Sequence, residues 1–164
     1  MEEKKIEDRR GSFGIGIYQG KNTLNIGTLW RSAYIYGASF IFTVGERYKK
    51  QPSDTINADR HIPLFHFDSL EEFTKAIPEN FDLICVEMVD TQKDMLGRFN
   101  HPDSAIYLLG AEDYGLPEEF LKGKRKLQIP SIREYSLNVA VAGSIVLYDR
   151  YVNRDLSKLS KEEE

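Results

Sequence analysis

The segment that most constrains the fold is residues 139–148, VAVAGSIVLY, which is apolar at nearly every position. A helix that is apolar on all sides is buried in the core of a protein. Ser136 and Asn138 stand just before it, and both residue types are ordinary caps for the first turn of a helix. The apolar end of a strand expected at 126–129 runs into Pro130 ahead of them. The pattern predicts a buried helix that begins where a polar loop leaves a strand, which is a suitable place for a functional site.

Strand-like and helix-like segments alternate along the rest of the chain. Strands are expected at 13–18, 39–44, 64–67, 81–86, 105–109 and 126–129, and helices at 24–36, at 69–77, from 117 and at 137–153. Segments 45–62 and 90–102 are expected to be loop or irregular. This alternation predicts an α/β domain with a mainly parallel sheet. Ligands bind beyond the carboxyl ends of such strands, so the candidate loops follow Tyr18, Val44, Leu109 and Ile129.

The composition fits one cytoplasmic domain of ordinary size. The chain has 164 residues, and we expect a single domain at 13–153 between charged tails at 1–12 and 154–164. No run resembles a signal peptide or a membrane span. The net charge of −4 gives no overall basic signature of a nucleic-acid binder, so any RNA contact must come from local patches. The single cysteine, Cys85, lies in an expected strand and is expected to be an inert core residue.

Two common kinds of site are disfavoured by spacing. Gly14, Gly16 and Gly20 do not match the G-x-G-x-x-G pattern of dinucleotide binding, and the first two lie within a strand, where they indicate close packing on one face. The three histidines are scattered, with no pair at metal-ligand spacing, so no metal is expected.

Two polar segments stand out beside the capped helix. Asn25 and Arg31 flank Gly27 in the first turns of an otherwise apolar helix. Glu112 lies between Gly110 and a second glycine, in a loop that follows a buried strand. Taken singly, each segment is explained equally well by helix capping, a surface arginine or a plain turn.

Together, the three segments resemble the SpoU (TrmH-like) branch of the SPOUT RNA methyltransferases. That family shows an N-x-G-x-x-x-R segment, a later G-x-E-x-x-G segment, and then I-P…S-L-N-V before an apolar helix. The same patterns stand here, in the same order, at 25–31, 110–115 and 129–139. The resemblance covers most of residues 13–150.

The resemblance implies a fold and an activity. It implies a mainly parallel sheet with helices on both faces and a deep C-terminal trefoil knot, an exception to the usual absence of knots. It implies a homodimer that uses S-adenosylmethionine to methylate a ribose 2′-hydroxyl of tRNA or rRNA, with no membrane or metal partner. The residues that match the family's cofactor positions are Leu109, Gly110, Ile129 and Leu137. Those that match its catalytic positions are Asn25, Arg31, Glu112, Ser136 and Asn138.

The resemblance also suggests roles for the polar set. Family proposals give the motif arginine the role of base, but a guanidinium stays protonated in proteins. We therefore expect Arg31 to grip an RNA phosphate through two parallel hydrogen bonds. Ser136 and Asn138 are expected to orient Arg31 or the ribose hydroxyl, and Glu112 to hold Asn25 or Arg31.

Local cations are the expected RNA contacts, although each is also explained as solvated surface. The candidates are Arg47, Lys49, Lys50, Arg60 and Arg133, and a second cluster comprises Lys122, Lys124, Arg125 and Lys126. Three other interpretations of the chain stay open. They are a SPOUT enzyme that methylates a base, an inactive RNA-binding or assembly protein of the same fold, and a flavodoxin-like nucleotide-binding module.

Overall fold

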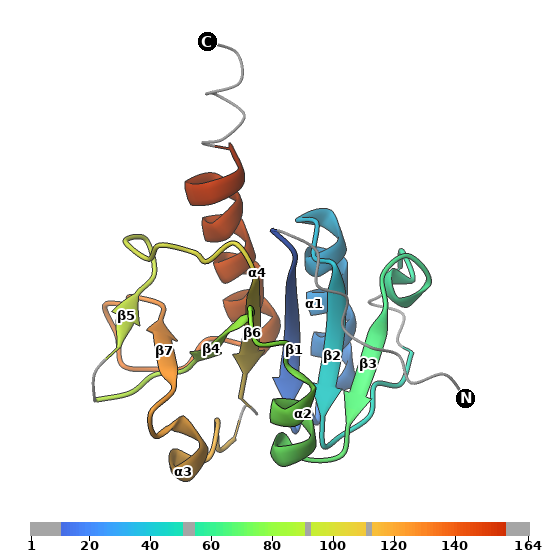
Figure 1. The fold of residues 1–164 in the computed structure, drawn as a ribbon, viewed down its shortest axis with the longest axis horizontal. Helices are drawn as coiled ribbons and strands as arrows, with labels where there is room; N and C mark the ends of the chain where they lie inside the picture. Colours follow the sequence, from blue (N-terminus) through green and yellow to red (C-terminus); the bar gives the residue numbers. More distant parts are fainter. Residues whose placement is uncertain (1–10, 51–54, 91–92, 111–112, 157–164) are drawn as a thin grey trace.

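The protein folds around one seven-stranded sheet, with strands in the order β3-β2-β1-β6-β4-β7-β5 (Figure 1). The computed structural model describes residues 11–50, 55–90, 93–110 and 113–156. The strands are β1 (Phe13–Tyr18), β2 (Phe40–Val44), β3 (Leu64–Phe67), β4 (Asp82–Val86), β5 (Asp94–Met95), β6 (Ala105–Leu109) and β7 (Arg125–Gln128). All paired strands run parallel, as the alternation in the sequence predicts.

Within the described ranges, four α-helices connect or cover the strands. They are α1 (Thr23–Ile35), α2 (Leu70–Ala76), α3 (Glu118–Leu121) and α4 (Val139–Arg150), with a short 3-10 helix η1 (Ala58–Arg60) and a π-helical end η2 (Tyr151–Leu156). No helix in the described ranges is long and apolar enough to cross a membrane. The parallel α/β sheet is thus confirmed, while the trefoil knot stays a prediction.

Three details differ from the expected elements. The segment expected to be irregular at 90–102 contains β5, which pairs with Leu127 and Gln128 of β7. The expected loop at 45–62 contains η1. The last helix begins at Val139 rather than at Leu137, because the Asn138 side chain accepts hydrogen bonds from the amides of Ala140 and Val141 and so caps it. A two-residue strand and a single 3-10 turn are too short to leave a periodic pattern in the sequence.

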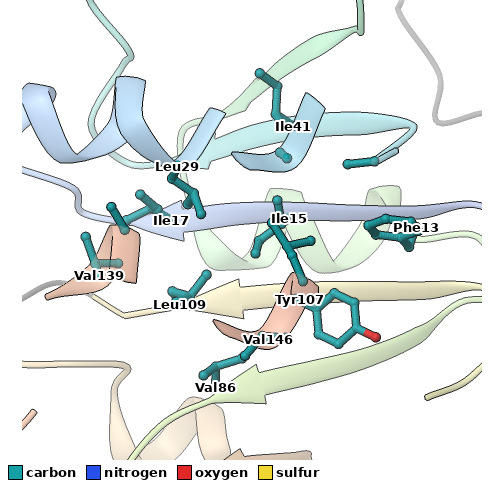
Figure 2. Close-up of a cluster of buried hydrophobic side chains, with 14 of the residues drawn as sticks. Phe13, Ile15, Ile17, Leu29, Ile41, Val86, Tyr107, Leu109, Val139 and Val146 are labelled. Atoms are coloured by element: carbon teal, nitrogen blue, oxygen red, sulfur yellow. The ribbon is translucent and has the colours of Figure 1, made fainter. Parts of the chain in front are cut away.

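One face of the sheet is covered by α1 and α4. Figure 2 shows Leu29 of α1 and Val139 and Val146 of α4 meeting Ile15 and Leu109 of the central strands. All five side chains are buried. One side of α4 therefore lies in the core, as predicted for the apolar segment at 139–148. The prediction of burial on all sides is wrong for the single chain, because Val141, Ile145 and Tyr148 on the other side are 47%, 36% and 55% exposed.

The other face is covered by α2 and α3 and is rich in phenylalanine. Phe42 stacks on Phe73 of α2 with ring centroids 4.8 Å apart. A Cβ atom on Gly14 would lie 2.1 Å from the ring of Phe40, and one on Gly16 would lie 2.4 Å from that of Phe42. The two glycines of β1 therefore make room for the neighbouring rings, which confirms close packing on this face.

Cys85 is fully buried on the phenylalanine-rich face, and burial raises the pKa of its thiol to about 12. Because burial disfavours the thiolate, which is the reactive form, the native protein should react with a thiol reagent at pH 8 about a thousandfold more slowly than a free cysteine. Stopped-flow assays with and without urea test this, and fast reaction of the folded protein would contradict it.

A buried polar network fixes α4 at the other end of the sheet. Arg150 is completely buried and donates to the carbonyl oxygens of Pro102 (2.8 Å) and Asp103 (3.0 Å). It also donates to the hydroxyl of Tyr107 at 3.1 Å. These contacts tie the last turn of α4 to the loop that enters β6, so α4 is held at both ends.

Candidate active site

A pocket of about 280 Å³ opens at the carboxyl ends of three adjacent strands, β6, β4 and β7. Its lining is formed by three short segments that follow these strands, together with the loop that leads into α4 and the start of that helix. The lining residues are Val86, Glu87, Met88, Gly110, Asp113, Tyr114, Gly115, Ile129, Ser131, Tyr135, Ser136, Leu137, Val139 and Ala142. This is the position at which parallel α/β sheets bind ligands.

The chain after β6 folds back tightly on itself at the pocket. A Cβ atom on Gly110 would lie 2.5 Å from the carbonyl carbon of Gly115 and 2.6 Å from the amide nitrogen of Leu116. Gly115 has a φ of +64°, a conformation that favours glycine. Both glycines are therefore needed for backbone to line the pocket wall.

Glu87 holds this glycine turn from β4. Its Oε2 accepts a hydrogen bond from the amide of Leu116 at 2.9 Å, and its Oε1 accepts one from Met88 at 3.2 Å. A Cβ atom on Gly115 would lie 2.4 Å from the same carboxylate. One side chain thus joins the segments that follow β4 and β6.

The pocket wall carries negative charge. Glu87 and Asp113 contribute carboxylates, and no Lys, Arg or His is among the described residues that line the pocket. Asp113 is exposed and pairs with Lys21 at 3.5 Å, whereas Glu87 is half-buried and bonded by backbone amides. Such a wall suits a neutral or cationic ligand with an apolar part and disfavours a phosphate.

Three of the four expected cofactor residues lie in the pocket wall: Gly110, Ile129 and Leu137. The fourth, Leu109, is 2% exposed at the end of β6, where its side chain belongs to the core beneath the pocket (Figure 2). The loops after Tyr18 and Val44, also expected as candidates, supply none of the described lining residues.

Sequence reasoning missed Glu87 and Met88, which follow β4 directly. The sequence could have indicated them, because β4 was expected as a buried strand. Its carboxyl end lies at the same edge of the sheet as the carboxyl ends of the other parallel strands. The candidate loops did not include the one after β4.

Asn25 and Asn138 are brought together although 113 positions separate them. The side-chain amide of Asn138 donates to Oδ1 of Asn25 at 3.0 Å, while its own Oδ1 caps α4. Ser136 lies in the pocket wall, and its hydroxyl points to the sulfur of Met88 at 3.7 Å. Asn138 thus serves both as a helix cap and as a contact of the site. Glu112 lies outside the described residues.

Arg31 lies away from Asn25, Asn138 and Ser136 of the same protomer. It follows Asn25 by six residues on α1, which places it about 9 Å farther along the helix axis. Its side chain is exposed, and no described residue forms an ion pair with it. The structure therefore does not bring Arg31 to the Asn25–Asn138 pair of the same protomer.

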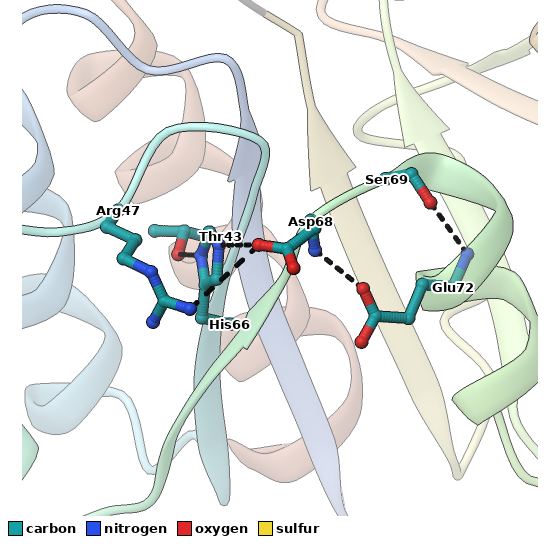
Figure 3. A network of polar contacts seen from close by, with 6 residues as sticks. All are labelled: Thr43, Arg47, His66, Asp68, Ser69 and Glu72. Carbon is teal, nitrogen blue, oxygen red and sulfur yellow. Dashed lines mark hydrogen bonds and ion pairs between the residues drawn. The ribbon is translucent and has the colours of Figure 1, made fainter.

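The expected RNA contacts are exposed, except for the half-buried Lys124 and Lys126, but they are not equally available. Arg47 lies 3.9 Å from Asp68, whose carboxylate also contacts His66 at 3.0 Å, in the network shown in Figure 3. In the second cluster, Arg125 pairs with Asp94 at 3.1 Å. Lys49, Lys50, Arg60 and Arg133 are exposed.

Comparison with known proteins identifies the family. The SpoU rRNA Methylase family matches residues 12–148, which is most of the chain. A protein solved in a study of the 2-OH methylation of C/U34 on tRNA is 25% identical, with a TM-score of 0.77 over 90% of this chain and 97% of its own. No curated protein sequence matches the chain.

Two larger structures share the fold. An AdoMet-bound rRNA methyltransferase from Sinorhizobium meliloti is 23% identical, with a TM-score of 0.78 over 91% of this chain and 59% of its own. The methyltransferase AviRb from Streptomyces viridochromogenes, in complex with AdoMet, is 22% identical, with a TM-score of 0.78 over 92% and 61%. This chain thus spans about three fifths of these two proteins. Together with the pocket at the strand ends, the match across most of its length shows that the chain belongs to the SpoU family of S-adenosylmethionine-dependent RNA methyltransferases.

Proposed function

We propose that the protein transfers a methyl group from S-adenosylmethionine to a ribose 2′-hydroxyl of tRNA or rRNA, and that it acts as a homodimer. The observation that carries this proposal is the negatively charged pocket at the ends of β4, β6 and β7, which adjoins the cap of α4 and hence the Asn25–Asn138 pair. Family membership supports the donor and the class of acceptor.

The residues of the pocket fit the donor. S-adenosylmethionine is an amphipathic molecule with a cationic sulfonium, and the pocket combines apolar side chains, hydroxyls and exposed backbone with carboxylates. Its volume of about 280 Å³ is just below the roughly 300–1,000 Å³ range of small-molecule sites. Gly110, Ile129 and Leu137 would hold the donor, and Glu87 would balance its positive charge. When bound, the donor supplies an activated methyl group.

Replacing Glu87 by glutamine is expected to weaken S-adenosylmethionine binding about tenfold, because the pocket loses the carboxylate that balances the sulfonium while one acceptor for Leu116 remains. Binding of the neutral product S-adenosylhomocysteine should change less. Calorimetry with both ligands measures the ratio. Glu118→Gln, at the exposed start of α3, is the matched control. Equal losses for both ligands would contradict the role of charge.

An exposed apolar face on α1 and α4 supports the homodimer. Leu24 and Ile35 of α1 are 53% and 62% exposed, and Val141 and Tyr148 of α4 are 47% and 55% exposed. A groove of about 330 Å³ runs along this face, lined by Thr28, Ala140, Val141, Ser144, Ile145 and Tyr148. Exposed apolar patches of this kind mark protein interfaces. In the proposed homodimer, a second copy of the chain covers this face.

The same face explains the position of Arg31. Leu24, Arg31 and Ile35 follow one another at helical spacing, so the guanidinium emerges within the apolar stripe of α1. In a dimer with a twofold axis through this face, Arg31 of each protomer is presented to the other. In the proposed dimer, Arg31 of one protomer therefore completes the site of the other.

The residues of the completed site then have different roles in the transfer. The donor already carries an activated methyl group, so the protein must mainly align the ribose oxygen with it, an effect worth roughly 7–11 kcal/mol in favourable cases. Arg31 holds a phosphate next to the ribose through its planar fork of donors. The ribose hydroxyl is oriented by three residues of the other protomer: Asn25, Asn138 and Ser136.

Transfer of labelled methyl from S-adenosylmethionine to total cellular RNA tests the proposal. Alkaline hydrolysis needs a free 2′-hydroxyl, so ribose methylation leaves label in alkali-stable dinucleotides, whereas base methylation leaves it in mononucleotides. Light scattering should give twice the 18.9 kDa mass of one chain. Absence of S-adenosylmethionine binding would refute the enzyme. Donor binding without transfer would favour an inactive RNA-binding protein.

A further inference from the structure

We propose that one flank of α1 binds an unpaired RNA nucleotide that neighbours the methylated one, by stacking its base on His61. We call this surface, formed by Arg31, Tyr34, Arg60 and His61, the α1 flank. The inference rests on the proposed function, because it concerns how the same site selects its RNA.

The α1 flank carries a stacked pair of aromatic rings that is open to solvent. The rings of Tyr34 and His61 lie 4.7 Å apart between centroids, with 28° between their planes. Tyr34 is 41% exposed and His61 is also exposed. Proteins bind unpaired bases by stacking them on exposed aromatic faces, which duplex bases cannot reach. The outer face of His61 can extend this stack by one base.

The backbone fixes His61 in place. Asn57 has a φ of +51° and turns the chain into η1, and Ala58 is completely buried below it. The amide of His61 donates to the carbonyl oxygen of Ala58 at 3.0 Å, which closes the turn. Because the base of the turn is buried, the ring of His61 is presented on a rigid support, and little entropy is lost on stacking.

Positive charge surrounds the ring pair. Arg31 precedes Tyr34 by one helical turn, and Arg60 is adjacent to His61. Both arginines are exposed, and neither forms an ion pair with a described residue. A guanidinium on each side of a stacking surface suits the phosphates on either side of one nucleotide.

A second segment adds charge to the same flank. Tyr48 packs edge-on against Trp30 of α1, with centroids 6.0 Å apart, and so holds the chain after β2 beside the helix. Lys49 and Lys50 follow it and are exposed. Among the described residues of these segments, the exposed cations Arg31, Lys49, Lys50 and Arg60 outnumber the two exposed carboxylates, Glu46 and Asp59.

The location of the flank indicates which nucleotide it holds. Arg31 lies between the apolar face of α1 and the ring pair, so the flank borders the proposed dimer interface. A nucleotide stacked on His61 would be a neighbour of the one whose phosphate Arg31 grips. RNA with unpaired bases next to the target ribose is therefore the class of substrate that the flank selects.

Binding of two fluorescein-labelled RNAs at low salt tests the inference: an unpaired oligonucleotide and a duplex of equal length. His61→Ala should weaken binding of the unpaired RNA on the order of tenfold and leave duplex binding nearly unchanged. His61→Phe, which keeps a ring, should restore it. Lys75→Ala on α2 is the control for surface charge, and S-adenosylmethionine affinity should be the same in all variants.

Each outcome is decisive. If His61→Ala binds unpaired RNA as wild type does, or loses duplex binding equally, the inference is overturned. It is also overturned if His61→Phe fails to restore binding, because the ring would then not act by stacking. These results leave the methyltransferase itself intact as long as wild type binds S-adenosylmethionine. Loss of that binding in wild type would instead refute the proposed function.

Discussion

Replacing Arg31 by alanine is expected to lower the rate of methyl transfer at least about a hundredfold while the affinity for S-adenosylmethionine stays unchanged. Arg31 is on α1 and is not among the residues that line the pocket, so its loss does not alter the donor site. What is lost is the grip on the RNA next to the reacting oxygen. Single-turnover transfer at saturating donor, with calorimetry for binding, measures both quantities.

Arg31→Lys separates charge from geometry. A lysine keeps the positive charge but lacks the planar fork of the guanidinium, so it should recover RNA affinity more than rate. A rate close to that of wild type would show that charge alone suffices. A large drop in donor affinity for Arg31→Ala would contradict the separation between Arg31 and the pocket.

Mixed dimers decide whether Arg31 acts in the partner's site. Gly110→Val blocks the pocket, because the side chain would meet the backbone of Gly115 and Leu116. Neither homodimer of the two variants should be active. If Arg31 crosses the interface, a dimer of Arg31→Ala with Gly110→Val has one complete site and regains about half the wild-type rate. If Arg31 acts within its own protomer, the mixed dimer is as inactive as its parents.

The fold was predictable because periodic patterns carry it. The runs that became β1, β2, β4 and β6 are mostly apolar and mostly buried, as is typical of strands covered on both faces. The segment that became α4 packs one side against α1 and the sheet, while its other apolar side, with Val141, Ile145 and Tyr148, is exposed in the single chain. By contrast, β5 is an edge strand that joins the described sheet by pairing with β7, which is a contact that no local pattern encodes.

The site was predictable in part, for a related reason. Gly110, Ile129 and Leu137 were predicted because they stand at the positions of the family motifs that the chain resembles, and the structure places all three in the pocket wall. Glu87 was missed because a single glutamate after a strand has no distinctive spacing, and its contact with Leu116 exists only once the chain has folded. The distance between Arg31 and Asn25 follows from helix geometry. The role proposed for Arg31, however, depends on a second copy of the chain, which the sequence of one chain does not describe.

The buried network at the far end of α4 should have the largest effect on stability. Burial raises the pKa of Tyr107, so its hydroxyl stays protonated. Because that oxygen accepts from Arg150, its own proton goes to Nδ1 of His101 at 2.6 Å. Nε2 of His101 then donates to Asp149 at 2.7 Å. The hydrogen bonds thus run in one direction from the Arg150 guanidinium through Tyr107 and His101 to the Asp149 carboxylate.

Replacing Arg150 by alanine is expected to lower the free energy of unfolding by about 3 kcal/mol or more. The change leaves the buried carbonyl oxygens of Pro102 and Asp103 without their donor and opens a cavity over the ring of Phe13, which lies 4.4 Å from the guanidinium. Urea unfolding at one fixed protein concentration measures the loss, because dimerisation makes stability depend on concentration. Lys75→Ala, which breaks only an exposed pair with Glu71, should cost about 0.5 kcal/mol or less. A loss below about 1 kcal/mol for Arg150→Ala would show that water or a shift of α4 replaces the missing donor, and that the network does not anchor the helix on which the pocket is built.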